Sequence, residues 1–110
     1  MSTNNTNNIF TQSGNNQALS VLTINSDLAI NTENIIYADA SLNNIIITLP
    51  ASPSSGDKIN IIRMDNNPVN TLRVEANTGQ TILQTGSYIT LDNQHDSLVL
   101  VFDVDNWQVV

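Results

Sequence analysis

The feature that most constrains this chain is a series of short apolar segments that recur about every 8–14 residues, with turn-forming residues between them. Apolar and polar residues alternate within several segments, and no long 3.6-residue period of an amphipathic helix is present. The predicted strands are residues 18–24, 28–30, 35–38, 45–50, 58–64, 70–76, 81–83, 88–91, 97–102 and 107–110; the first could instead form one helical turn. The pattern predicts an all-β fold: an antiparallel β-sandwich or barrel, jelly-roll-like, of about eight to ten short strands.

The segment 97–102 is apolar on both of its sides. Its alternation directs Leu98, Leu100 and Phe102 one way and Val99 and Val101 the other. A strand of this kind is expected to be covered on both faces, either in the middle of a sandwich or against a partner subunit. These residues are therefore the candidates for the core and for contacts between subunits.

A turn and a second strand follow this segment and complete a predicted hairpin. Residues 103–106 supply turn chemistry, because Asp can bond its own backbone and Asn tolerates a positive φ. Trp107, the only Trp, lies on one face with Val109 and is expected to be buried, as the last of the core candidates. We expect this hairpin to close the core.

The composition limits the partners that the chain can bind. The 110 residues suffice for one domain, and only 12% of them are charged, against about 25% in typical globular proteins. Asn, Ser and Thr replace charged residues in the composition, and the chain contains eighteen Asn. Components of large assemblies often stay soluble in this way, without many charges. The net charge is −7 and Lys58, Arg63 and Arg73 are the only cationic residues, so neither nucleic acid nor an anionic membrane is an expected partner.

Cysteine and long apolar stretches are also missing from the sequence. The lack of Cys excludes disulfides and thiolate metal sites. No window approaches the roughly 18 apolar residues of a spanning helix, and the N-terminus lacks the apolar core of a signal peptide. We therefore expect neither a membrane span nor a secretion signal.

The N-terminal residues 1–17 are low in complexity and almost uncharged. With only Ile9 and Phe10 to bury, they cannot offset the entropy cost of their own ordering. Two interpretations follow: an arm that is disordered in isolation, or an anchoring arm that orders on a partner through Ile9 and Phe10. The predicted division is an arm over residues 1–25 and a β-domain over residues 26–110.

No group of residues predicts catalysis, a cofactor or a bound metal. His95, Asp96 and Ser97 are the residue types of a hydrolase triad, but consecutive residues at a strand entry point to alternating faces and cannot converge. His95 is the only His, and the segment 103–106 lacks the Gly and Glu that complete a calcium loop. Arg73 and Glu75 are neighbours on one side of a predicted strand, so we expect a surface ion pair between them. The sequence therefore predicts a protein that is not an enzyme.

From Tyr37 onward, about two thirds of the chain resembles a β-domain of structural proteins from tailed bacteriophages and some other viruses. The matching pieces, in order, are Tyr37-x-Asp39-Ala40-Ser41, Ile47-Thr48-Leu49-Pro50, Ser55-Gly56-Asp57, Ile59-x-Ile61-x-Arg63-x-Asp65, Asn70-Thr71-Leu72-x-Val74, Gly79-x-x-Ile82 and Asp96-Ser97-Leu98-x-Leu100-Val101-x-Asp103-x-x-Asn106-Trp107-x-Val109. Members often have Gly in the turn before Asn-Trp, where this chain has Val104-Asp105, which suggests a different turn type.

The resemblance implies a component of the virion surface that is made in the host cytoplasm: a head fibre, capsid decoration protein or tail fibre. Such proteins are commonly homotrimers, whose N-terminal segment attaches to a capsid or other virion protein while the β-domain projects. The alternative is a receptor- or carbohydrate-binding module of a tail fibre that recognises a host surface glycan. Sugar sites usually show several aromatic platforms, and this chain holds only Phe10, Tyr37, Tyr88, Phe102 and Trp107.

Overall fold

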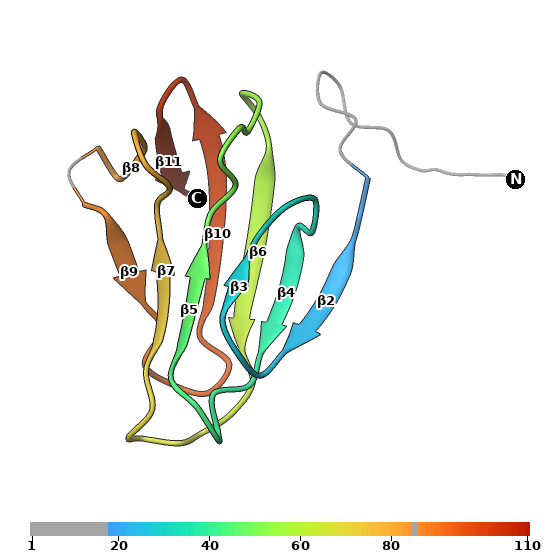
Figure 1. Ribbon diagram of the computed structural model, residues 1–110, viewed down its shortest axis with the longest axis vertical. Helices are drawn as coiled ribbons and strands as arrows, with labels where there is room; N and C mark the ends of the chain where they lie inside the picture. Colours follow the sequence, from blue (N-terminus) through green and yellow to red (C-terminus); the bar gives the residue numbers. More distant parts are fainter. Residues whose placement is uncertain (1–17, 85) are drawn as a thin grey trace, which may run out of the picture.

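The structure is a computed structural model and describes residues 18–84 and 86–110. These residues form ten strands and contain no helix (Figure 1). The strands are β2 (Val21–Ile24), β3 (Leu28–Ala29), β4 (Ile35–Ala38), β5 (Ile45–Thr48), β6 (Lys58–Arg63), β7 (Leu72–Glu75), β8 (Thr81–Ile82), β9 (Tyr88–Thr90), β10 (Ser97–Asp103) and β11 (Asn106–Val109). Each predicted strand is present, and most are shorter than predicted.

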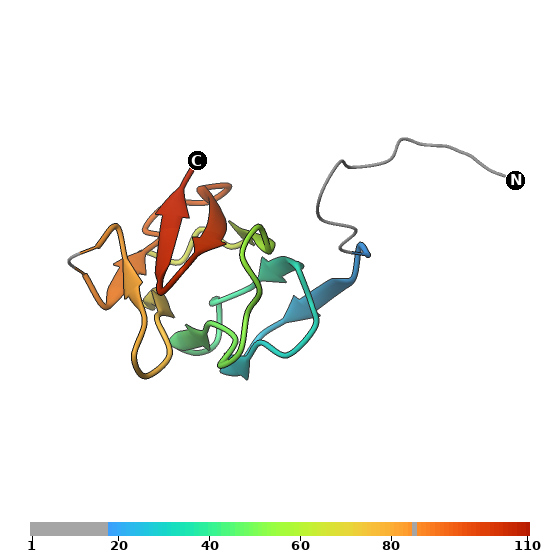
Figure 2. The ribbon, with the colours of Figure 1, turned by 90° about the horizontal axis from the view of Figure 1, so that it is seen from above.

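The strands form two sheets that pack as a sandwich, so the predicted all-β sandwich class is confirmed. One sheet has the order β2-β4-β6-β10-β11-β8, and the other has the order β3-β5-β7-β9. The two layers are separate in the view from above (Figure 2). Each sheet has two edge strands, so the described fold is a sandwich of open sheets rather than a closed barrel.

The predicted antiparallel, jelly-roll-like arrangement is wrong for most of the strand pairs. Five of the eight pairings are parallel: β2–β4, β4–β6, β3–β5, β5–β7 and β8–β11. From β2 to β10, successive strands alternate between the two sheets. Two chain reversals therefore separate most neighbours within a sheet, which makes them parallel. The two-residue alternation of side chains is the same in parallel and antiparallel strands, so it could not reveal the direction.

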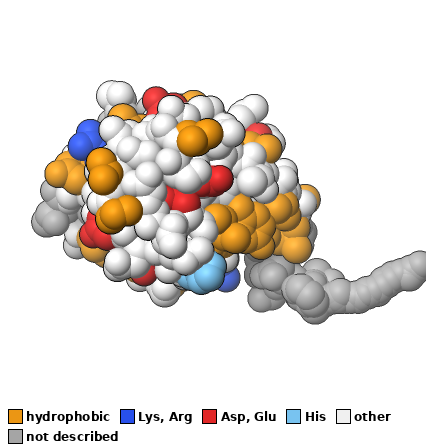
Figure 3. All heavy atoms as spheres, turned by 90° about the horizontal axis from the view of Figure 1, so that it is seen from below, with side chains coloured by type: hydrophobic (Ala, Val, Ile, Leu, Met, Phe, Trp, Pro, Cys, Tyr) orange, Lys and Arg blue, Asp and Glu red, His pale blue; other side chains and the backbone are white. Residues whose placement is uncertain are grey.

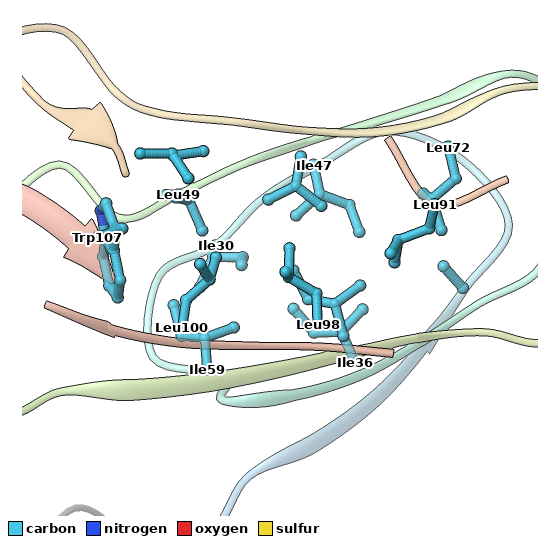
Figure 4. Close-up of a cluster of buried hydrophobic side chains, with 14 of the residues drawn as sticks. Ile30, Ile36, Ile47, Leu49, Ile59, Leu72, Leu91, Leu98, Leu100 and Trp107 are labelled. Atoms are coloured by element: carbon cyan, nitrogen blue, oxygen red, sulfur yellow. The ribbon is translucent and has the colours of Figure 1, made fainter. Parts of the chain in front are cut away.

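The core lies between the two inner faces (Figure 4). Ile36, Ile59, Leu98 and Leu100 of the six-stranded sheet face a second layer, which includes Ile47 of the four-stranded sheet. The most deeply buried positions of both sheets are completely inaccessible to water, including Leu100 and Ile47 at 0% exposure. Because side chains alternate along each strand, every second residue points into the core that the two sheets share.

The strands β10 and β11 form the predicted hairpin at the end of the chain. Phe102 pairs with Trp107, and their ring centroids lie 5.0 Å apart at an interplanar angle of 58°. Trp107 is fully buried, as predicted, and its Nε1 donates a hydrogen bond to Gln80 Oε1 at 2.9 Å. The residue with positive φ is not the predicted Asn106, which lies in β11, but Val104 with φ 61°. A β-branched residue is strained there, because the side chain crowds the backbone in this region.

The segment predicted as an arm overlaps the first described strand. Val21–Ile24 form β2, which pairs with β4 along its whole length. The side chain of Asn34 fixes the approach to β2: its Nδ2 donates to Ala18 O and its Oδ1 accepts from Ser20 N. A truncation that preserves the six-stranded sheet must therefore end before Ala18.

Candidate interaction surfaces

The outer face of the six-stranded sheet carries apolar side chains along four neighbouring strands. Its residues follow from the strand register, which aligns the outward positions of adjacent strands. We call this surface the apolar outer face; it consists of Val21 in β2, Ile35 and Tyr37 in β4, Asn60 and Ile62 in β6, and Val99 and Val101 in β10. Val21 is 58% exposed, and the other six are half-buried. Within the described residues, the side chains of this surface are therefore only partly covered.

The core and subunit-contact candidates divide between the two sides of β10, as the alternation predicted. Leu98, Leu100 and Phe102 are buried against the core. Val99 and Val101 are half-buried on the apolar outer face. The core thus covers one side of β10, and the expectation that the other side is also covered stays a prediction.

Charged side chains on this side of the sheet lie at one end only. Among the outward residues of β2, β4, β6, β10 and β11, the charged ones are Lys58 and Asp103. Lys58 pairs with Val101, and Asp103 is the next outward residue of β10, so both lie at the upper end in Figure 1. The centre of the apolar outer face is therefore uncharged in a chain with net charge −7.

Asn60 lies in the middle of the apolar outer face. It pairs with Ile35 on one side and with Val99 on the other. Its Oδ1 is buried and accepts no hydrogen bond from the described residues. A buried polar atom without a partner costs about 1–3 kcal/mol, so Asn60 is a costly residue at a position where Val would fit the strand.

The surface seen from below has the same uneven distribution. Hydrophobic side chains form one contiguous area on the side of the molecule where β2 and β4 lie (Figure 3). The rest of the visible surface is mainly polar, with scattered single hydrophobic residues. Scattered residues are usual on a soluble protein, whereas a contiguous area indicates an interaction surface.

The outer face of the four-stranded sheet is polar by comparison. Arg73 of β7 forms the predicted ion pair with Glu75, and its Nε donates to Glu75 Oε2 at 2.7 Å. The Arg73 guanidinium also lies 4.4 Å from the ring centroid of Tyr88 in β9, in cation–π geometry. Tyr88 is 51% exposed, which makes it the most accessible aromatic side chain among the described residues.

A buried ion pair holds the loops at the lower end of the sandwich together. Arg63, the last residue of β6, is 2% exposed and forms a salt bridge with Asp65 at 3.1 Å. Its guanidinium also donates hydrogen bonds to Leu91 O, Asn67 O and Asn70 O, each at 2.8 Å. The Arg63 side chain thus joins the loop that directly follows its own strand to Leu91, which lies 28 positions away in the sequence.

The carboxylate of Asp65 is fully used by this cluster. It accepts backbone hydrogen bonds from Ala40 N at 2.7 Å and Asn67 N at 2.9 Å, in addition to those from Arg63. Burial raises the pKa of Asp65, but the hydrogen bonds from Arg63, Ala40 and Asn67 and the charge of Arg63 lower it to about 2. With its groups satisfied by protein atoms, the cluster is structural.

Sequence reasoning did not identify the Arg63–Asp65 cluster, although a signal for it was present. Alternation places Arg63 on the same side of its strand as Ile59 and Ile61, which are core residues. Arg63 is one of three cationic residues in the chain, and Asp65 follows it two positions later. An Arg on the apolar side of a strand with an Asp so close indicates a buried ion pair.

A hollow of about 410 Å³ lies at the upper end of the sandwich. Its lining residues are Ala18, Ser20, Asn31, Thr32, Glu33, Pro50, Ser52, Pro53, Asp57 and Ile59. Glu33 Oε1 accepts a hydrogen bond from Asn31 N at 3.0 Å, and this backbone contact lowers the pKa of the Glu33 carboxyl. Asp57 Oδ2 accepts from Ser54 N at 2.9 Å. Both carboxylates thus accept hydrogen bonds that hold local loops.

The side chains weighed for catalysis or metal binding lie in turns or at the ends of strands. His95 is exposed with φ 69°, and the neighbouring Asp96 Oδ2 accepts from Asn93 N at 3.0 Å. Ser97 is exposed at the start of β10. Residues 18–84 and 86–110 contain no group of three or more His, Cys, Asp or Glu side chains that could hold a metal ion.

Ile9 and Phe10, the candidates for attachment, lie outside the described residues. Comparison of the chain with models of known protein families and with curated proteins finds no match. Within the described part of the chain, there is no helix of the length and hydrophobicity needed to cross a membrane. Inferences about function therefore rest on the surfaces described above and on the resemblance in the sequence.

Proposed function

We propose that this chain is a non-enzymatic structural protein of a virion, a homotrimeric head fibre or capsid decoration module. The observation that carries the proposal is the apolar outer face, whose half-buried side chains would be covered by neighbouring subunits. Sheets with many parallel strands usually have both faces covered, which supports the same conclusion. The resemblance from Tyr37 onward supplies the class of protein.

In this proposal the protein is made in the host cytoplasm and attaches to a capsid or other virion protein through the N-terminal part of residues 1–25. The β-domain projects from the particle, and it has no role with nucleic acid or membranes. The strand β2 would then belong to the β-domain, so the attachment residues precede Ala18. Ile9 and Phe10 remain the apolar side chains that are available for anchoring.

Light scattering behind a sizing column tests the oligomer, on the full chain and on a variant that lacks residues 1–17. Trimers of both are expected, because the proposal places assembly in the β-domain. A second test replaces Ile9 and Phe10 with Ser and measures co-sedimentation with virus particles that lack the protein. Binding should be abolished while the trimer persists; loss of the trimer would contradict this division of roles.

A receptor- or carbohydrate-binding module of a tail fibre is the second candidate function. The observation that favours it is Tyr88, an exposed aromatic ring beside Arg73 on the polar outer face. Trp107 and Phe102 are buried and could not stack against a sugar. A glycan array would be probed with the wild type and with Tyr88→Ala; binding that persists in the variant would exclude this site.

A further inference from the structure

We infer that Asn25, in the turn between β2 and β3, is a site of spontaneous modification, where the side-chain amide is converted into a carboxylate through a cyclic imide formed with the backbone nitrogen of Ser26. Asn is one of the chemically labile residues of proteins, and this chain contains eighteen of them. The inference does not depend on the proposed function. It rests on the residue that follows Asn25, on the hydrogen bonds around both residues and on the position of the turn.

The reaction is intramolecular and consumes only water. The backbone nitrogen of the next residue loses its proton and attacks Cγ of the Asn, so that an N–Cγ bond forms, the Cγ–Nδ2 bond breaks and ammonia leaves. Water then opens the ring at either carbonyl carbon and gives aspartate or isoaspartate. Three conditions favour the attack: the next N–H donates no hydrogen bond, the side-chain amide is not held, and the next side chain is small.

Asn25 meets the three conditions. Ser26 has the smallest side chain that follows any described Asn, and both residues are exposed. Within residues 18–84 and 86–110, neither the Asn25 side chain nor the Ser26 N–H makes a hydrogen bond. Other atoms hold the turn: Asn25 O accepts from Asn43 Nδ2 at 3.1 Å, and Asp27 Oδ1 accepts from Ile46 N at 2.8 Å. The turn is therefore fixed in place while its reacting groups are free.

Several of the other described Asn residues precede an N–H that is already bonded. Asn67 N, which follows Asn66, donates to Asp65 Oδ2 at 2.9 Å. The second N–H is likewise bonded in four further pairs: Asn31–Thr32, Asn44–Ile45, Asn70–Thr71 and Asn77–Thr78. Such an N–H must lose its hydrogen bond before it can attack, so these Asn residues should react more slowly than Asn25.

The remaining described Asn residues are protected in other ways. Asn43 and Asn93 donate hydrogen bonds from their side-chain amides, to Asn25 O at 3.1 Å and to Asp96 Oδ2 at 3.4 Å. Asn67 precedes a Pro, which has no N–H. Three more are half-buried or buried and lie within or directly before a strand: Asn34, Asn60 and Asn106. Asn25 is therefore the one described Asn that meets every condition.

The position of the turn determines what the modification would change. The turn joins β2 and β3, which are edge strands of different sheets and each pair with one neighbour (Figure 1). Isoaspartate inserts a methylene group into the main chain of this turn and places a second carboxylate near Asp27. We expect the longer turn to loosen β2, which connects residues 1–17 to the sandwich, while the core between the sheets stays folded.

The test incubates the full chain at pH 8.5, where loss of the backbone proton is favoured, and follows every Asn by peptide mapping with mass spectrometry. Asn25→Gln is the informative variant, because Gln must form a larger ring and reacts far more slowly. Asn31→Gln is the matched control in another exposed turn. Hydrogen exchange of the β2 amides, before and after incubation, measures whether that strand loosens.

Asn25 should be converted several-fold faster than any other described Asn, and Asn31→Gln should leave this rate unchanged. Exchange of the β2 amides should become faster as isoaspartate accumulates, and Asn25→Gln should prevent the change. If another described Asn reacted first, or if Asn25 reacted only after unfolding in urea, the inferred site would be wrong. Conversion of Asn25 with unchanged exchange in β2 would overturn the expected effect on the strand.

Discussion

The outer face of the six-stranded sheet and the outer face of the four-stranded sheet are built by the same two-residue alternation, yet they carry different side chains. The first presents Ile35, Ile62 and Val99 around a single amide. The second presents an ion pair between Arg73 and Glu75. The polar face is what a sheet needs when one side packs on a core and the other meets water.

The difference shows which part of the hydrophobic pattern serves the fold of one chain. Both inner faces are apolar and buried, and together they form the core. The outward apolar residues of β4, β6 and β10 add nothing to that core, because they point away from it. We propose that they serve a contact outside the single chain, as in the proposed function above.

The largest expected effect is at the lower end of the sandwich, where Arg63 at the end of β6 forms a buried ion pair with Asp65. Asp65→Ala should lower the free energy of unfolding by about 3–5 kcal/mol, because it leaves the guanidinium of Arg63 buried without its counter-charge. Urea denaturation at pH 7 measures the change. Asp39→Ala is the control: Asp39 Oδ1 accepts only a bond from Ser41 N within its own loop, so the loss should be about 1 kcal/mol. Equal losses would contradict the central role of the cluster.

The next prediction compares the two inner faces directly. Leu100 in β10 and Leu72 in β7 are both 0% exposed and contribute to the core from opposite sheets. Truncation of either to Ala should lower the free energy of unfolding by about 2–5 kcal/mol, because each leaves a cavity in the same core. Thermal and chemical unfolding of the two variants would give the values. A negligible loss at Leu72 would mean that the four-stranded sheet is not part of one cooperative core.

The stability of the fold should also depend on pH through Asp65. Its pKa is lowered from 3.8 to about 2 in the folded protein, so the ionised carboxylate stabilises the fold above about pH 4. That contribution, about 2 kcal/mol, is lost as the pH falls from about 4 toward 2. Unfolding free energies of the wild type and of Asp65→Asn would be compared at pH 7, 4 and 2.5. The difference between the two proteins should shrink at the lowest pH; a constant difference would contradict this origin.

Much of the fold could be predicted from the sequence, because strand existence and side-chain direction depend on local alternation. The strand β4 was predicted to the residue, and Trp107 is buried as expected. Strand direction could not be predicted, since parallel and antiparallel strands share the same alternation. The strained φ of Val104 was missed because residue type favours Asn at such a position.

The candidate surfaces were only partly visible in the sequence. The two-sided character of β10 follows from five consecutive apolar residues, from Leu98 to Phe102. The continuation of its outer side across Asn60 and Ile35 depends on strand order and register, which bring together residues far apart in the sequence. Only the folded sheet shows that one amide lies at the centre of an apolar surface.

The smallest expected effect lies on the polar outer face. Glu75→Gln removes the ion pair with Arg73, whose side chains remain 40% and 29% exposed for Arg and Glu respectively. Because water screens such a pair, the free energy of unfolding should change by about 0–1 kcal/mol. Urea denaturation in low and high salt would measure it, and the small effect should decrease further with salt. The result should be the same at every protein concentration, since this face is not proposed to meet another copy. A concentration-dependent loss would place a subunit contact on the polar face and reverse the comparison between the two sides of the sandwich.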